Sequence, residues 1–423
     1  MLRGRACGLP PDNVRAWWLR VVRCGAARSV AVKLLRSVLS SRARLDSEDI
    51  TARLLTFLAP LVRDEDDTPT ADDDNSQDFV DEQRLMARLV HLMRHDDTDK
   101  QFRIYGTARR FFGHGTARRI QHTLVPLVFR SLDLAKRVRA RERAGETMQF
   151  ASRRVFQFIH EICTALASSH PEVSLGLFVQ SGQAADACEF DPIAYEFFTQ
   201  AFILYEDLVD SKVQVASMTT IISTLHQCCH LEQANYENLI MRATQYAAKL
   251  LKKPDQCRMV CMCAQLFWKD NGGPEGRPFH HPREVLECLQ RSLKIADVWC
   301  VPESCSLFVH ILNMAMFFFE RRCTSVRSTW VQGGGRVAVH TAHCGARVAA
   351  DHGCVHHRLD RVDPGACRDD GGWRHAHTGG SPLPQHAAAH RSHAGQARRC
   401  HVQGRRLEVT HTPAVEGCWR CAV

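Results

Sequence analysis

Cysteine and histidine lie close together at several points of this 423-residue sequence, and both can supply nucleophiles or metal ligands. Cys228, Cys229 and His230 are consecutive, a pattern that suits a thiol nucleophile or a pair of ligands. Cys229 also continues an apolar helical stripe, where a free thiol acts as a small hydrophobic group. We therefore prefer a core role for it. His160 stands beside Glu161 with no evident third partner.

The end of the chain holds further potential ligands. One cluster comprises His352, Cys354, His356 and His357. Cys418 and Cys421 form a CxxC, which could bind zinc, with Cys400 and His401 upstream. A second ligand pair at the proper spacing is missing, and a segment rich in His and Cys produces such clusters by chance. We predict no metal site here.

The sequence carries none of the common catalytic motifs. GxxxxGK[ST], GxSxG and HExxH are absent, and the helical region has no paired CxxC. Gly113, His114 and Gly115 precede a predicted helix and could form an anion site, although a turn between helices explains them better. We expect no catalytic, cofactor-binding or metal-binding residues, and hence no enzyme.

Net charge gives little support to a nucleic-acid partner. The formal charge is +9, but no basic stripe alternates with exposed aromatic residues in the helical region. The segment Asp64–Glu82 is acidic and could bind a metal or a basic partner. Acidic runs usually stay solvated and disordered, so a loop between helices is the better interpretation.

Apolar residues recur at helical spacing over most of the chain, and no β-rich segment precedes residue 320. Asp191 and Pro192 suit the start of a helix, with Asp191 as its cap. The inward positions of that helix are predicted to be Ala194, Phe197, Phe198, Ala201, Leu204, Tyr205 and Leu208. A later helix should bury Tyr236, Leu239, Ala243, Ala247 and Leu250. The last helix should bury Cys305, Phe308, Val309, Leu312, Met316 and Phe319.

A chain of many amphipathic helices joined by short loops can adopt one of two architectures, a globular bundle or an α-solenoid. One core stops growing beyond about 250–300 residues, whereas stacked helix pairs have no such limit. The pairs occupy about 40 residues, near the HEAT or armadillo period. We predict an all-α, HEAT/armadillo-like solenoid of stacked antiparallel helix pairs over 26–323. Residues 1–25 form an uncertain basic segment, and 324–423 form a disordered tail.

The cellular compartment is predicted from the positions of the cysteines and from the composition of the N-terminal and apolar segments. Cys163, Cys229, Cys263, Cys288 and Cys305 sit at apolar positions, which favours a reduced, cytosolic protein. The run 305–319 is too short to span a membrane. The Arg-rich segment 1–45 resembles a mitochondrial transit segment, although a solenoid helix through Val32, Leu35, Val38 and Leu39 is the preferred interpretation.

Three long segments carry a family resemblance: Gln77–Phe102, Thr107–Phe129 and Asp191–Trp268. They resemble the large subunit of retromer, the vacuolar protein sorting-associated protein 35 family. YEFFTQAFILYEDLVDSK and KLLKKPDQ are the most specific parts, and the match runs collinearly from Ser29 to Glu320. Only the C-terminal half of the family aligns.

The resemblance implies a non-enzymatic scaffold of the retromer coat. In this family the C-terminal half carries a metallophosphoesterase-fold subunit, vacuolar protein sorting-associated protein 29. The coat sits on the cytosolic face of endosomes and returns transmembrane receptors to the Golgi. The segment that binds the arrestin-fold subunit is missing, so that contact is in doubt, and cargo receptors are indirect partners. The alternatives are a generic HEAT-like adaptor and a truncated, non-functional product.

A solenoid groove can wrap a small globular partner, and its anchors should be aromatic or Arg residues within a polar rim. The candidates are Tyr195, Phe198, Tyr205, Tyr246, Arg258 and Trp268. Phe198 and Phe202 are better explained as core residues. Tyr and Trp are the better anchors because they keep a polar tip.

The composition changes abruptly after Arg322. Residues 324–423 contain no Phe, Tyr, Ile, Lys, Met or Asn, and such a segment cannot bury enough apolar surface to fold. We predict a shifted reading frame or a mis-joined gene at this point. Sequencing the transcript across codons 315–330 tests this, and an intact frame would refute it.

Overall fold

The computed structural model describes residues 26–63, 77–270, 272–299 and 304–333. The chain divides into two units, residues 1–356 and 357–423, and all described residues belong to the first. The N-terminal helices are α2 (Ala26–Ser41), α3 (Glu48–Phe57), α4 (Ala59–Val62), α5 (Gln77–Val90), α6 (Thr98–Phe112), α7 (Ala117–Arg143) and α8 (Ser152–Ala167). The following helices are α9 (Pro171–Ala187), α10 (Asp191–Glu206), α11 (Ser211–Gln227), α12 (Gln233–Ala247), α13 (Lys253–Cys263), α14 (Pro282–Val298), α15 (Ser304–Glu320) and α16 (Thr324–Gly333).

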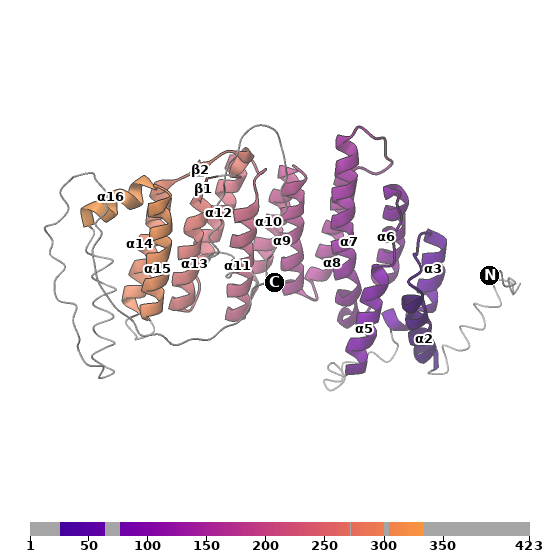
Figure 1. Ribbon diagram of the computed structural model, residues 1–423. Helices are drawn as coiled ribbons and strands as arrows, with labels where there is room; N and C mark the ends of the chain where they lie inside the picture. Colours follow the sequence, from indigo (N-terminus) through magenta and orange to yellow (C-terminus); the bar gives the residue numbers. More distant parts are fainter. Residues whose placement is uncertain (1–25, 64–76, 271, 300–303, 334–423) are drawn as a thin grey trace, which may run out of the picture. The chain divides into compact units, whose positions relative to one another are not determined.

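The helices stack in two layers, as Figure 1 shows. In one layer α7, α9, α11, α13 and α15 contact each other in that order. In the other layer α8 contacts α10, α10 contacts α12, and α14 contacts α16. Consecutive helices join the layers, and the main packing contacts link elements that are close in sequence. This arrangement confirms the predicted α-solenoid, because each helix buries its apolar face against its nearest neighbours.

Two predicted stripes are confirmed in detail. In α12 and the turn that follows it, all five predicted residues are buried. In α10 and the residue pair after it, only Leu204 of the predicted set stays partly exposed. Both helices have one continuous apolar face, so the period of 3.6 residues fixes which side turns inward.

The stripe predicted for α15 is correct at Phe308 and wrong at its other five positions. The buried residues are Leu307, Phe308, Ile311, Ala315 and Phe318. Val309, Met316 and Phe319 are exposed instead, and Cys305 is partly exposed. This helix is apolar nearly all round, so the pattern alone does not select a face. No helix among the described residues is both long enough and apolar enough to cross a bilayer.

Two helices, α6 and α9, lie where no apolar stripe was predicted. Helix α9 contacts α7, α8, α10 and α11, and it buries residues on several sides. Its Gly182 lies against Phe198, where an added Cβ would stand 3.0 Å from the ring. Helix α9 therefore shows no single stripe, because neighbours cover most of its circumference.

The predicted borders of the solenoid need correction at its end. Helix α16 continues the packing to Gly333 and contacts α14 and α15, so order does not stop at 323. Helix α2 contains the predicted N-terminal stripe, with Leu35 fully buried. The predicted basic segment 1–25, most of the acidic run, and the cysteines and histidines beyond residue 333 lie outside the described residues.

A small hairpin interrupts the helices. Strand β1 (Trp268–Lys269) pairs antiparallel with β2 (Phe279–His280). The 3₁₀ turn η1 (Ala264–Phe267) precedes β1, and the 3₁₀ turn η2 (Pro274–Gly276) lies between the two strands. The main-chain N–H groups of Glu275 and Gly276 donate to the carbonyls of Leu231 and Cys229, at 3.1 and 2.8 Å. The hairpin thereby holds the loop between α11 and α12.

A buried ion pair joins the N-terminal helices. Arg119 of α7 is 2% exposed, and its guanidinium lies 2.9 Å from the carboxylate of Glu82 on α5. The same guanidinium donates to the carbonyl of Leu61 in α4, at 3.1 Å. The other carboxylate oxygen of Glu82 accepts from Arg28 of α2, at 2.8 Å. Helices α2, α4, α5 and α7 thus meet at the Arg119–Glu82 pair. Each of the two buried charges has an opposite charge beside it.

Replacement of Arg119 by methionine should destabilise this region strongly. It removes one partner of a buried pair and leaves the Glu82 carboxylate without its fully buried cation, at a cost of about 3–5 kcal/mol. Arg84→Met is the matched control, because Arg84 and its partner Asp81 are 67% and 51% exposed. Urea unfolding followed by circular dichroism would measure both. Equal midpoints for the two variants would contradict the structural role of the pair.

Candidate partner-binding surface

Aromatic residues of α10 and α12 form a seam between these two neighbouring helices. The seam consists of Phe202 and Tyr205 of α10 with Tyr246 of α12. The ring of Tyr246 stacks on Phe202 at 5.7 Å between centroids and lies 5.4 Å from Tyr205. Arg242 lies over the Phe202 ring at 5.1 Å and 3.7 Å from the Glu206 carboxylate. Two of the predicted anchors, Tyr205 and Tyr246, are therefore in contact.

The seam is apolar in its depth and polar at its surface. Burial and, to a smaller extent, the nearby Tyr246 phenol together raise the pKa of Tyr205 to about 12. Burial also raises the pKa of Tyr246, and its hydroxyl donates to Glu206. Both phenols therefore stay neutral at physiological pH. Tyr246 is half-buried and packs against the core.

The predicted anchors differ in accessibility. Arg258 is exposed and forms a surface ion pair with Asp255, at 3.8 Å. Tyr195 and Tyr246 are half-buried, and both pack against the core. Tyr205 is 5% exposed and Trp268 is 8% exposed, so we correct the expectation that these two keep a free polar tip. Phe198 is fully buried, as its core interpretation requires.

Trp268 is bound within the hairpin. Its indole stacks on His280 at 4.1 Å between centroids, and its Nε1–H donates to Asp270 at 3.1 Å. The same Asp270 carboxylate interacts with His280 and Arg321. Burial alone would raise the pKa of Asp270, but the hydrogen bonds and positive charges of Arg321 and His280 together lower it. The indole N–H of Trp268 therefore makes an intramolecular hydrogen bond.

Three apolar residues at helix ends are exposed, which the periodicity of the sequence does not predict. Val209 follows α10 and is 94% exposed, Leu251 follows α12 and is 81% exposed, and Val298 ends α14 and is 76% exposed. Because consecutive helices run antiparallel, α10, α12 and α14 share one direction and end on the same edge of the stack. Single exposed apolar residues are ordinary, whereas contiguous apolar patches mark interaction surfaces, and these three residues lie at the ends of successive helices of one layer.

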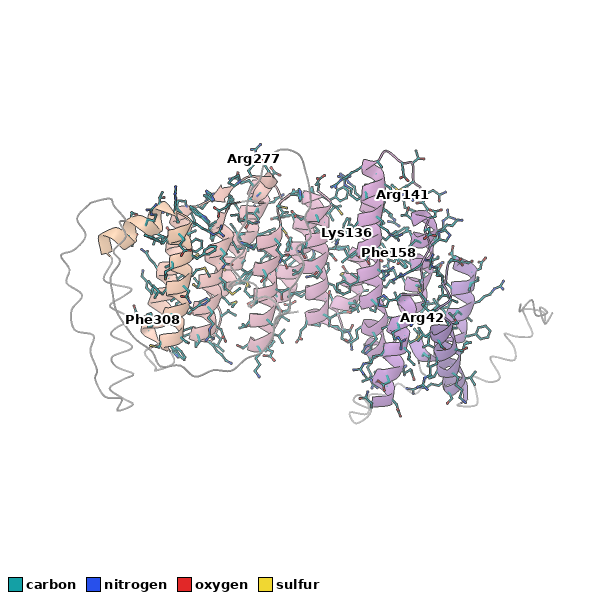
Figure 2. The ribbon with its side chains drawn as sticks, viewed as in Figure 1. Arg42, Lys136, Arg141, Phe158, Arg277 and Phe308 are labelled. Atoms are coloured by element: carbon teal, nitrogen blue, oxygen red, sulfur yellow. The ribbon has the colours of Figure 1, made fainter. Side chains whose placement is uncertain are left out.

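A cavity of about 730 Å³ opens between α6 and α8. Phe102, Arg103 and Arg109 line it from α6, and Phe158, labelled in Figure 2, lines it from α8. Arg109 lies over the Phe158 ring at 5.2 Å and pairs with Glu161. Such aromatic and arginine linings are enriched where proteins bind partners.

A basic surface lies where α2, α5 and α7 approach each other. Two adjoining cavities share Arg44 and Arg94, and the larger has a volume of about 480 Å³. Their other cationic residues are Arg42, Arg88, Arg130, Lys136 and Arg137, of which Figure 2 labels Arg42 and Lys136. Asp96 and Asp133 pair with Arg44 and Arg130, so cations remain in excess. The surface favours an anionic partner.

Asp186 anchors a polar junction between α9 and the loop after α11. Its carboxylate is 2% exposed and accepts the main-chain N–H of Cys229 at 3.0 Å and that of His230 at 2.8 Å. Lys269 of β1 is also buried and donates to the carbonyl of Cys228 at 2.5 Å. Burial lowers the pKa of Lys269, whereas the nearby Asp186 opposes that shift.

The structure revises the predicted roles of the chemistry-bearing residues. Helix α11 ends at Gln227, so the buried thiol is that of Cys228, whereas Cys229 is half-buried in the loop. The ring of His160 packs between Phe178 and Phe197, and its neighbour Glu161 pairs with Arg109. Gly113, His114 and Gly115 lie in the turn between α6 and α7, as predicted.

Asp191 also differs from its predicted role. It occupies the first turn of α10, and its side chain instead binds the start of α12. The main-chain N–H of Glu232 donates to it at 2.8 Å, and the side chain of Asn235 donates at 2.7 Å. Asp255 lies inside the first turn of α13, where it does not cap the helix. The acid at α10 therefore joins two helices of one layer.

Cysteines of the described residues are free, and most are buried. Burial raises the pKa of Cys163 and of Cys288 to about 12, and that of Cys257 to about 11. Burial and the Asp186 carboxylate raise the pKa of Cys229. Every thiol pKa that shifts in the described part of the chain is raised, which disfavours the nucleophilic thiolate.

Helix pairs that stack in two layers and contact mainly their neighbours define the class of α-solenoid proteins. The family model described as "Vacuolar protein sorting-associated protein 35" matches residues 17–333. The chain belongs to this family. Its match extends beyond the segment Ser29–Glu320 on which the resemblance was first based.

Similar proteins come from plants, fungi and amoebae. Vacuolar protein sorting-associated protein 35B of Arabidopsis thaliana is 35% identical over 309 residues, 70% of this chain and 38% of that protein. Vacuolar protein sorting-associated protein 35 of Schizosaccharomyces pombe is 33% identical over 263 residues, which cover 60% of this chain and 31% of that protein. The Dictyostelium discoideum protein of that name is 31% identical over 307 residues, which cover 71% of this chain and 39% of that protein. This chain thus spans under two fifths of the length of these relatives.

Stability should fall as the pH rises above 9. A buried thiol with a raised pKa keeps its proton in the folded state but loses it in the unfolded chain above pH 9, its ordinary pKa. Each such thiol therefore lowers the free energy of unfolding by about 1.4 kcal/mol per pH unit until its folded pKa is reached. The lowered pKa of Lys269 makes the free energy of unfolding rise with pH as that lysine titrates. This single group opposes several buried thiols, so the net effect is a fall in stability.

Urea unfolding between pH 8 and 11, with reductant and constant ionic strength, measures this slope. Cys288→Ala should make the slope shallower, whereas Cys305→Ser, which changes a partly exposed thiol, should leave it unchanged. A flat pH profile for the unaltered chain would show that these thiols do not stay protonated in the folded state.

Proposed function

We propose that this chain is a scaffold subunit of the retromer coat and has no catalytic activity of its own. It binds the metallophosphoesterase-fold subunit, vacuolar protein sorting-associated protein 29, and supports return of transmembrane receptors from endosomes to the Golgi. It works in the cytosol and on the cytosolic face of endosomes, held there through the complex. The observation that carries this proposal is the family match over residues 17–333 on a two-layer solenoid.

The partner surface is proposed to lie on the layer of α10, α12 and α14. Tyr195 and Tyr246 remain accessible anchors of the predicted set on this layer, whereas Arg258, also accessible, lies on α13 of the other layer. The apolar edge of Val209, Leu251 and Val298 adds contacts that lose water on binding, which is a stronger source of affinity than exposed charge. Tyr205 and Trp268 support this surface from within. Contact with an arrestin-fold subunit is not part of the proposal.

The basic surface favours a second candidate function, a HEAT-like adaptor for acidic ligands. Its cationic residues exceed their acidic partners at Arg44 and Arg94. Binding through such a surface would weaken steeply as salt rises, because counterions compete with the ligand. Binding through the apolar edge would change little over the same range.

The full chain should capture the metallophosphoesterase-fold subunit of its own organism in a pulldown at both about 50 mM salt, where charges are weakly screened, and about 500 mM salt, where they are strongly screened. Val209→Asp combined with Leu251→Asp should weaken binding about tenfold or more, because it places two charges in a desolvated contact. Both residues are exposed in the free chain, so the fold should persist.

Ile50→Asp on α3 is the matched control, since Ile50 is 53% exposed and lies away from this layer edge. It should bind as the unaltered chain does. Capture lost only at high salt would favour the adaptor for acidic ligands. Failure of a helical, soluble chain to bind at either salt would reject the scaffold role and favour a non-functional product.

A further inference from the structure

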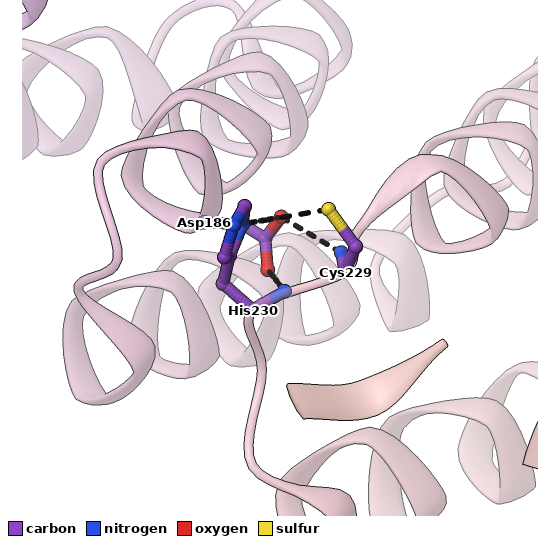
Figure 3. A group of neighbouring side chains, drawn as sticks. All are labelled: Asp186, Cys229 and His230. Atoms are coloured by element: carbon purple, nitrogen blue, oxygen red, sulfur yellow. Dashed lines mark hydrogen bonds and ion pairs between the residues drawn. The ribbon is translucent and has the colours of Figure 1, made fainter. Parts of the chain in front are cut away.

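Three metal-binding side chains converge beside the end of α9. Figure 3 shows Asp186 of α9 with Cys229 and His230 of the loop between α11 and α12. The Cys229 Sγ lies 3.4 Å from the His230 Nδ1, which in turn lies 3.6 Å from the Asp186 Oδ2. All three donor atoms lie within 4.8 Å of one another.

These separations suit one tetrahedral ion. Zinc bonds of about 2.3 Å to sulfur and about 2.0–2.2 Å to nitrogen and oxygen place neighbouring donor atoms roughly 3.3–3.6 Å apart. The Sγ–Nδ1 and Nδ1–Oδ2 distances in the structure, 3.4 and 3.6 Å, lie in this range. A thiolate, an imidazole and a carboxylate are also the donor set that zinc accepts, whereas magnesium and calcium require oxygen donors.

A catalytic relay would need a different arrangement. In a Cys–His–Asp relay, the two ring nitrogens of histidine contact the thiol and the carboxylate separately. Here the same Nδ1 faces both Cys229 and Asp186, as ligands of a common centre do.

Surrounding contacts hold the donors in place. The Asp186 carboxylate accepts the main-chain N–H groups of both Cys229 and His230, which ties the loop to the acid. The carbonyl of Cys229 accepts from Gly276 on the other side, at 2.8 Å. Asp186 is buried, Cys229 is half-buried and His230 is exposed, so an ion can enter from solvent along the histidine.

We propose that Asp186, Cys229 and His230 form a zinc site that links α9 to the loop between α11 and α12. Water completes the fourth position. Binding releases the thiol proton and fastens two successive helices of one layer, and the net charge of the ligands cancels that of the ion. The Cys229 thiolate and the Asp186 carboxylate thus neutralise the zinc ion, which would otherwise lie as an uncompensated cation near the buried Lys269.

Alkylation of individual cysteines in the full chain tests this site directly. The thiols of the reduced, metal-free protein are labelled with iodoacetamide with and without zinc, and peptides are resolved by mass spectrometry. Zinc should slow labelling of Cys229 about tenfold or more, because the bound thiolate is no longer a free nucleophile. Cys305, partly exposed on α15, is the internal control and should label at an unchanged rate.

His230→Ala removes an exposed ligand and should abolish the protection of Cys229 while the helices persist in circular dichroism. His281→Ala is the matched control, since His281 precedes α14 outside the cluster. Cobalt(II) provides a second readout: its thiolate charge-transfer band should diminish in His230→Ala and in Cys229→Ser. Unchanged Cys229 labelling with zinc, or protection that survives His230→Ala, would overturn the proposal.

Discussion

Each helix of this protein depends on its nearest neighbours to cover its apolar face. One helix buries only a stripe, so a pair leaves apolar surface that the next pair must remove from water. The two layers meet this requirement by contact between helices two positions apart, such as α9 with α11 and α10 with α12. The free energy gained at each step is local, at about 25 cal/mol per Å² of apolar surface buried.

Polar groups trapped between the layers are satisfied by partners on other helices. Arg119 and Glu82 join four N-terminal helices, and Asp186 joins α9 to the loop that starts α12. A buried charge without a partner would cost several kcal/mol, so these contacts fix the register of neighbouring helices. The apolar contacts provide most of the stability, and the polar contacts select one arrangement.

The sequence predicts the helical stack because α10 and α12 carry single, continuous stripes. It does not predict α9, whose neighbours cover several faces, or the inward face of α15, which is apolar all round. The Asp186 cluster could not be predicted either. Cys229 and His230 follow Asp186 by 43 and 44 positions in the sequence. Only the packing of the ends of α9 and α11 brings the three residues together. Exposure of Val209 and Leu251 likewise follows from where each helix ends.

Contacts restricted to nearby elements also govern how the chain is made. The packing partners of α7 lie among α5, α6, α8 and α9, so their burial does not wait for the C-terminal helices. Low contact order keeps the loop-closure entropy of each step small and makes such folding fast. The stack can therefore form progressively from its N-terminal end while the ribosome still synthesises the rest, with each emerging pair docking on a completed surface.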